Sequence, residues 1–112
     1  MAKAKAKCNE SSPIDQIDRT IHSPARLKIL AFMAVVDKAD FTFLMNQTGL
    51  TRGNLSSHLG VLEEANYINV EKTFVEKIPR TLIQINAAGR QAMEDYRENM
   101  RNVLDGLLGG GR

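Results

Sequence analysis

The sequence predicts a mainly α fold with one small β-hairpin, and two observations lead to this prediction. Apolar residues recur at helical spacing up to about residue 65, alternate one by one over residues 67–85, and return to helical spacing after that. Aromatic residues make up only 5% of the chain and tryptophan is absent, so the core must be aliphatic, which favours helices over a β-sandwich. A length of 112 residues predicts a single domain.

Two helices are predicted on either side of Ser23. The first covers residues 13–22, because its isoleucines recur at i, i+3 and i+7. These are Ile14, Ile17 and Ile21. Ser23 and Pro24 then open a second helix over residues 24–36, since serine caps a helix and proline fits its first position. The apolar stripe of this helix consists of Leu27, Leu30, Met33 and Ala34.

A helix-turn-helix follows after a polar break at residues 37–40. A short third helix is expected over residues 42–48, with Phe43 and Leu44 facing inward. Thr51 then caps a fourth helix that ends near residue 65. Only a glycine and a leucine separate the two helices, which is typical of a helix-turn-helix.

The hairpin and a last helix complete the predicted fold. Strands are expected over residues 67–73 and 81–85, joined by a longer tip at Phe74–Arg80. An isolated hairpin is marginally stable, so this one must pack on the helices as a wing. Together these elements predict a winged helix-turn-helix domain. Its parts are a disordered basic tail (1–12), the DNA-binding domain (13–86), a dimerisation helix (87–108) and a flexible tail (109–112).

The fourth helix carries the strongest functional signal. Its three leucines fall on one stripe and must face the core, whereas the rest of its surface is glycine and short polar side chains. Such a surface lets a helix lie close to the floor of a DNA groove. Arg52 suits a guanine edge, and Asn54 or Ser57 suits base edges or phosphates. The competing interpretation is that this face of the helix is only exposed to solvent, while the leucines on the other face pack on the core.

The stretch TGLTRGNLSSHLGVLEEANYI, followed by PRT and AAGR, resembles the small winged-helix transcriptional regulators related to the MarR and ArsR types. The resemblance covers residues 21–96 and implies a recognition helix at Thr51–Ala65, a wing at Phe74–Arg80 and a dimer. By position, it implies DNA contacts from Thr51, Arg52, Asn54, Ser56, Ser57, Lys77 and Arg80. The wing departs from the family pattern, in which the tip is commonly more basic. Here Glu76 and Ile78 lie beside Lys77 and Arg80, so the net charge of the wing is small.

The last helix has an apolar stripe that a monomer of this size can hardly cover. The first predicted helix has the same problem, so both are expected to form a homodimer interface. Its predicted residues are Ile14, Ile17, Ile21, Met93, Tyr96, Met100, Val103, Leu104 and Leu107. Such a dimer sets two recognition helices about one DNA turn (~34 Å) apart. The sequence therefore predicts a regulator, most simply a repressor, on a pseudo-palindromic operator in double-stranded DNA.

Several other functions are not expected. A single cysteine, Cys8, and no apolar run near the ~18 residues of a membrane span predict a cytoplasmic protein without a disulfide or membrane contact. No residues have metal-site or catalytic spacing, so we expect no metal, no cofactor and no enzymatic activity. His58 is expected to pack or to bond a core carbonyl. The resemblance leaves open an unknown small-molecule effector, and a module that binds protein instead of DNA is the alternative function.

Overall fold

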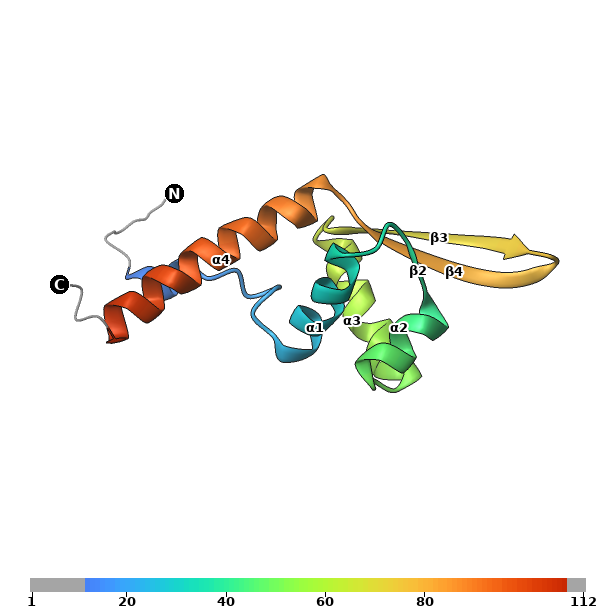
Figure 1. Ribbon diagram of the computed structural model, residues 1–112, viewed down its shortest axis with the longest axis horizontal. Coiled ribbons are helices and arrows are strands. Elements are labelled where there is room, and N and C mark those ends of the chain that lie inside the picture. The colour runs from blue at the N-terminus through green and yellow to red at the C-terminus, as the bar shows by residue number, and fades with distance from the viewer. Residues whose placement is uncertain (1–11, 109–112) are drawn as a thin grey trace.

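A computed structural model describes residues 12–108 and confirms the predicted fold class, with helices packed against a small antiparallel sheet (Figure 1). The elements are η1 (Pro13–Gln16), α1 (Pro24–Ala34), β2 (Ala39–Asp40), α2 (Phe41–Thr48), α3 (Arg52–Glu64), β3 (Ile68–Val75), β4 (Ile78–Ile85) and α4 (Ala87–Leu108). The two predicted tails lie outside the described residues, apart from Ser12, as does Cys8.

The core lies where α1, α2 and α3 meet the inner end of the sheet. It is aliphatic, as predicted, and each of these elements contributes to it. The largest fully buried side chains are Ile21, Ile29, Leu30, Met33, Leu44, Leu55, Leu62, Ile68 and Ile83. Burial of this set fixes α3 against the sheet, and the outer face of α3 is left exposed.

The predicted helix-turn-helix is confirmed, and its helix ends are capped. Oδ1 of Asp40 accepts the first backbone N–H groups of α2 at 2.6 and 3.4 Å. After α2, Gly49 adopts a φ of 75°, the left-handed conformation that commonly ends a helix. The hydroxyl of Thr51 accepts the N–H of Asn54 at 3.1 Å and so begins α3.

Two details of α1 and α2 differ from the prediction. Helix α1 ends at Ala34, two residues early. Phe43 was expected to face inward but is 42% exposed, whereas Phe41 packs against the core. The reason is the helical spacing, because Phe41 lies three residues before the buried Leu44 and shares its face, whereas Phe43 is about 100° away. Helix α2 also begins one residue earlier than predicted, after its cap Asp40.

The predicted polar break before α2 contains a short strand. In β2, Ala39 pairs with Ile83 and Asp40 with Leu82, so β4 is the central strand of the order β2-β4-β3. This pairing ties the hairpin directly to the start of α2.

The hairpin is longer than predicted and its turn is tighter. Ile68–Val75 pairs with Ile78–Ile85 along its whole length, so most of the predicted tip, Phe74–Arg80, is strand. Only Glu76 and Lys77 form the turn, with φ values of 53° and 69°. Positive φ at both positions is the conformation of a type I′ turn, which matches the twist of the flanking strands.

The predicted helix over residues 13–22 is wrong. Only Pro13–Gln16 forms a helical turn, of the 3₁₀ type, and Ile17 after it is extended. Oδ1 of Asp18 accepts the backbone N–H two residues further on at 2.9 Å, a local turn that competes with a helix. Ile21 is completely buried in the core, so it has no surface left for a partner.

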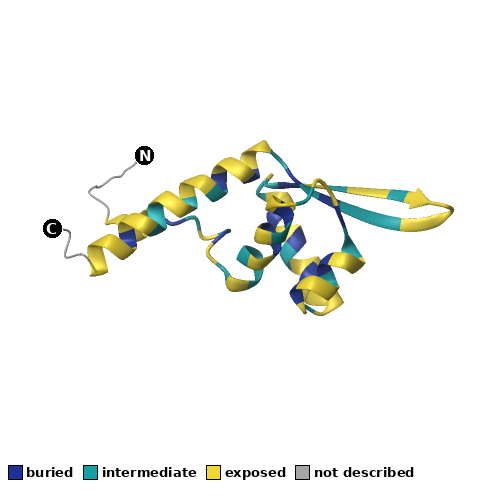
Figure 2. Cartoon of the chain, viewed as in Figure 1, coloured by how far each residue is buried: buried dark blue, intermediate teal, exposed yellow. Residues whose placement is uncertain are grey.

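Helix α4 follows Asn86, the predicted cap, whose Oδ1 accepts the N–H of Gly89 at 2.8 Å. A Cβ on Gly89 would overlap the backbone oxygen of Tyr67, so only glycine fits this contact. The first half of α4 packs on the core, whereas its second half extends beyond the core and contacts η1 (Figures 1 and 2). Within residues 12–108, no helix combines the length and the apolar character needed to cross a membrane.

Candidate nucleic-acid interface

The outer face of α3 carries glycine and short polar side chains over its first part, and the exposed Val61, Glu63 and Glu64 follow toward its C-terminal end. Its three leucines are buried and orient the helix; they are Leu55, Leu59 and Leu62. At about 100° per residue, Gly53, Ser57 and Gly60 lie opposite this buried stripe. The residues predicted to contact DNA from this helix are all exposed: Thr51, Arg52, Asn54, Ser56 and Ser57.

Gly53 and Gly60 have no steric reason within the chain to be glycine. A Cβ added to either would meet no heavy atom within 4 Å. A glycine inside a helix is destabilising by roughly 0.5–1 kcal/mol relative to alanine. These two glycines therefore leave the backbone of α3 open to an approaching molecule.

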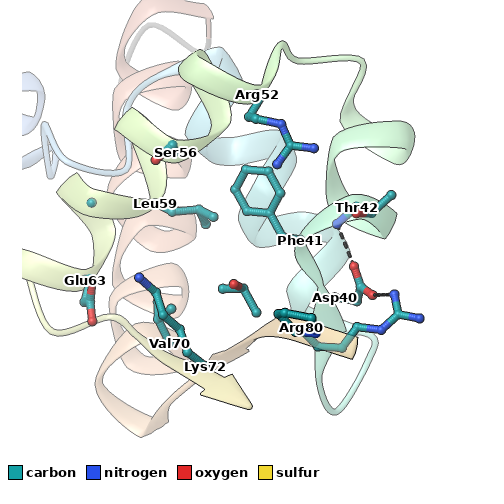
Figure 3. A pocket seen from close by; sticks show the side chains of 13 residues that line it. Asp40, Phe41, Thr42, Arg52, Ser56, Leu59, Glu63, Val70, Lys72 and Arg80 are labelled. Carbon is teal, nitrogen blue, oxygen red and sulfur yellow. Dashed lines mark hydrogen bonds and ion pairs between the residues drawn. The ribbon is translucent and has the colours of Figure 1, made fainter. Parts of the chain in front are cut away.

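A groove of about 520 Å³ runs between α3 and the hairpin (Figure 3). The residues on its helix wall are Arg52, Ser56, Leu59, Gly60 and Glu63. The residues on its sheet wall are Val70 and Lys72 of β3 and Pro79, Arg80 and Thr81 of β4. The groove therefore joins the predicted recognition helix and the predicted wing into one continuous surface.

Arg52 stands at the mouth of this groove. The guanidinium carbon lies 5.3 Å from the centre of the Phe41 ring, a cation–π contact that holds the side chain in place (Figure 3). Among residues 12–108, the side chain of Arg52 makes no hydrogen bond or ion pair, so its guanidinium N–H groups are free to bind another molecule.

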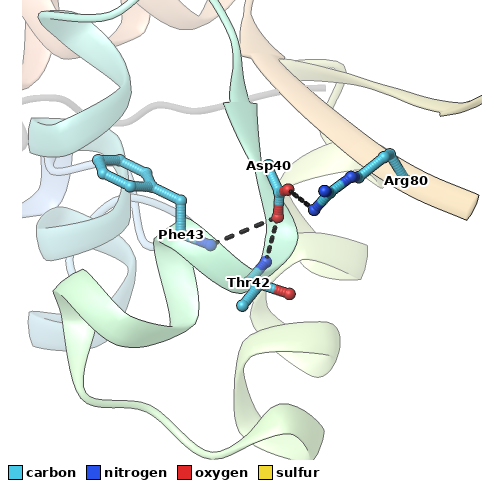
Figure 4. Close-up of polar contacts among 4 residues, drawn as sticks. All are labelled: Asp40, Thr42, Phe43 and Arg80. Carbon is cyan, nitrogen blue, oxygen red and sulfur yellow. Dashed lines mark hydrogen bonds and ion pairs between the residues drawn. The ribbon is translucent and has the colours of Figure 1, made fainter. Parts of the chain in front are cut away.

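Asp40 links the hairpin to α2 (Figure 4). One of its carboxylate oxygens caps α2, and the other accepts a hydrogen bond from Nη1 of Arg80 at 2.8 Å. Arg80 was predicted to contact DNA from a loop, but it lies on β4 and uses part of its guanidinium in this ion pair. Its side chain remains 40% exposed, so other N–H groups still face solvent.

Lys72 is a groove residue that the sequence analysis did not single out. It lies on β3, two residues after Val70, so both side chains point to the same face of the hairpin and line the groove. Alternation from Val70 is the signal that could have identified it. In the described part of the chain Lys72 has no ion-pair partner, nor has Lys77 in the turn. Glu63 brings one negative charge to the helix wall.

His58 lies outside the groove and contacts Arg26 of α1. Its Nδ1 accepts a hydrogen bond from Nη1 of Arg26 at 3.0 Å, so its hydrogen-bond partner is a guanidinium and not the core carbonyl that the sequence analysis expected. Nε of Arg26 donates to the backbone oxygen of Thr20. These contacts connect α1 to α3.

Tyr67 connects the end of α3 to the N-terminal segment. Its hydroxyl donates to Oδ2 of Asp18. This hydrogen bond, burial and the negative charge of Asp18 disfavour the phenolate, and together they raise the pKa of Tyr67 to about 12. The contact is structural, because neither residue lines the groove.

A second groove, of about 690 Å³, lies between α1 and α4 and is largely apolar. Its apolar lining consists of Leu27, Ala34, Met93, Tyr96, Met100 and Leu104. Three residues of the predicted dimer interface are buried within the chain: Ile17, Ile21 and Val103. The other six retain exposed surface: Ile14, Met93, Tyr96, Met100, Leu104 and Leu107.

The described residues contain no cluster of three or more histidine, cysteine, aspartate or glutamate side chains placed to hold a metal ion.

Known proteins are similar to this chain in sequence and in fold. Residues 25–104 match the family of winged helix DNA-binding domains. An uncharacterized protein of Methanocaldococcus jannaschii is 33% identical over 78 residues, which cover 70% of this chain and 85% of that protein. The structure of a transcriptional regulator homologue from Pyrococcus horikoshii OT3 is similar with a TM-score of 0.78 and 30% identity, over 86% of this chain and 97% of that one.

A more distant neighbour shares the fold alone. NadR, solved in complex with 4-hydroxyphenylacetate, is 20% identical with a TM-score of 0.63, over 88% of this chain and 72% of that chain.

Proposed function

The chain belongs to the family of winged helix DNA-binding domains, and from this membership we propose that it is a sequence-specific transcriptional regulator without enzymatic activity. The observation that supports this most directly is the outer face of α3. It has bare glycine backbone and short polar side chains beside a groove with an unpaired arginine. This chemistry fits the major groove of double-stranded DNA, where a helix must approach the base edges closely.

The exposed residues of α3 are assigned to the bases and to the adjacent phosphates. Arg52 would donate two hydrogen bonds to O6 and N7 of a guanine, because its guanidinium is held by Phe41 and makes no other polar contact in the described chain. Asn54 and Ser57 would contact base edges. Thr51 and Ser56 would contact phosphates near the positive end of the helix.

The hairpin is assigned to the flanking backbone. Lys77 and Arg80 would contact phosphates, Arg80 with the N–H groups that it does not give to Asp40. Lys72, which lines the groove, joins them. Each phosphate contact releases counterions, so the slope of log affinity against log salt should fall by about 1 when Lys77 is changed to alanine.

We propose that the regulator works as a homodimer through α4. The second half of α4 leaves Leu104 and Leu107 exposed, and Ile14 beside them is exposed too. A two-fold axis through this surface would place two α3 helices about one DNA turn (~34 Å) apart and match a pseudo-palindromic operator. Occupation of such an operator within a promoter would repress transcription.

An effector, if the regulator responds to one, is proposed to bind in the apolar groove between α1 and α4. The groove volume of about 690 Å³ is within the range typical of small-molecule sites. A partner subunit packed on α4 would close it. One structural neighbour, NadR, was solved with the small aromatic acid 4-hydroxyphenylacetate.

Selection of genomic fragments by the purified protein tests this function. We expect sequencing of the retained DNA to show one enriched motif with two inverted half-sites, and binding that weakens steeply with salt. Retention of fragments in proportion to their abundance, with no motif, would contradict the proposed function.

A further inference from the structure

The tip of the hairpin is apolar on both of its faces. Phe74 is 70% exposed, and Val75 and Ile78 are about half exposed. The strand register pairs Phe74 with Pro79 and Val75 with Ile78. Because successive residues of a strand point to opposite faces, the first pair lies on one face and the second pair on the other.

By strand alternation, the Phe74–Pro79 pair lies on the same face of the hairpin as Val70 and Lys72, beyond the residues that line the groove from β3. Val70 and Lys72 line this groove from β3, and Phe74 comes next at the same alternation. Pro79, its register partner, also lines the groove. A duplex lying on α3 and following the groove outward would therefore reach Phe74, at the end of the hairpin that projects beyond the helices (Figure 1).

An apolar tip of this kind fits an enclosing partner better than a flat one. A flat protein surface can cover only one face of the hairpin, whereas a nucleic-acid groove has walls that cover both. Lys72 and Lys77, before and after Phe74 in the sequence, have no ion-pair partner within residues 12–108, and Glu76 in the turn offsets one of these two charges. Phosphates along the walls of a DNA groove would neutralise these two cations.

We propose that Phe74, at the hairpin tip, inserts as an apolar wedge at a base step of the minor groove beside the site of α3 and bends the duplex. The inference rests on the proposed function and deepens it. A regular minor groove is ~6 Å wide, and two strands ~4.8 Å apart with side chains on both faces need more room. The groove must therefore open, which apolar wedges achieve by unstacking a step and kinking the DNA toward the major groove.

The bend angle of the complex tests the wedge. The probe is the tightest duplex recovered by the full-length protein from a random-sequence pool, and the measurement is circular-permutation electrophoresis. We expect the parent to bend this duplex by an angle in the range ~20–90°. Phe74→Ala should lose at least half of the bend and bind about tenfold more weakly, with an unchanged salt slope.

Val35→Ala is the matched control, because Val35 is also an exposed apolar residue, at 80%, and lies at the end of α1 and not at the hairpin tip. It should bend and bind DNA like the parent. Thermal unfolding of both variants checks that each is folded, which is expected because both side chains are mostly exposed.

The outcomes separate the wedge from the function on which it rests. A parent complex that depends on Arg52 but leaves the duplex straight would overturn the wedge alone. Equal bends for the parent and Phe74→Ala would do the same. If Phe74→Ala instead weakens self-association in sedimentation and leaves the bend intact, the tip belongs to a subunit contact and the wedge is overturned. A parent that selects no duplex overturns both the wedge and the proposed function.

Discussion

At the scale of single residues, Asp40 shows how one carboxylate connects two parts of the site. It caps α2 through one oxygen and pairs with Arg80 through the other. We expect Asp40→Ala to lower the free energy of unfolding by about 1–2 kcal/mol, mainly through the lost cap. Asp40→Asn retains a capping oxygen and should lose only ~0.2–1 kcal/mol, the contribution of a partly exposed ion pair. Urea unfolding measures both, and equal losses would mean that the ion pair, not the cap, is the main contribution.

Tyr67 gives a prediction that depends on pH. Its pKa is raised to about 12 in the folded chain from an ordinary value of 10.0, so the folded state favours the neutral phenol. The stabilisation is therefore complete below pH 10 and is lost as the pH rises through 12. Tyr67→Phe should be less stable than the parent by about 1 kcal/mol near neutral pH, and the difference should shrink above pH 10. Urea unfolding across this range checks it, and a constant difference would contradict it.

The residues of α3 could be predicted from the sequence, but their neighbours could not. The spacing of the leucines determines which side chains of one helix are exposed, so Arg52 and Ser57 were identified correctly as surface residues. The contact of Arg52 with Phe41 joins separate helices, and the pairing of Arg80 with Asp40 joins a strand to a helix cap. Helical and strand periodicity carry no information on such contacts.

At the scale of elements, a glycine of α3 is predicted to affect the stability of the fold and the affinity for DNA in opposite directions. Gly60 faces open space on the groove wall, so Gly60→Ala meets no clash and should stabilise the helix by roughly 0.5–1 kcal/mol. The same methyl group would hold the DNA away from the backbone, and we expect weaker binding to the selected duplex. Thermal unfolding and a binding titration on one preparation measure both effects. A stabilised variant that binds the duplex as tightly as the parent would contradict the proposal that DNA approaches the backbone of α3 at Gly60.

The elements with clear end signals were predicted well. Thr51 and Gly49 determined the helix-turn-helix, because a cap and a left-handed glycine define helix ends locally. The hairpin turn was missed, since Glu76 and Lys77 adopt positive φ without the asparagine or glycine that usually indicates it. The first predicted helix failed because isoleucine spacing alone fitted a helix, while Asp18 formed a local turn.

At the scale of the whole molecule, the exposed second half of α4 predicts a dimer. Leu107 is 75% exposed, so Leu107→Glu should leave the fold of the subunit intact and shift the protein toward monomer. The affinity for a duplex with two half-sites should fall as the dimer dissociates, because a monomer contacts only one half-site. Sedimentation and binding titrations measure these effects, with Val35→Glu as the matched control. A parent that sediments as a monomer at all concentrations would contradict the dimer.

The central claim is that the outer face of α3 reads DNA bases, and one measurement tests it most directly. The parent and Arg52→Ala are each used to select duplexes from the same random-sequence pool, and the enriched motifs are compared. The parent should yield two inverted half-sites, and Arg52→Ala should lose its preference at one base position in each, a discrimination of about 1–3 kcal/mol. Identical motifs from the two proteins would contradict the account.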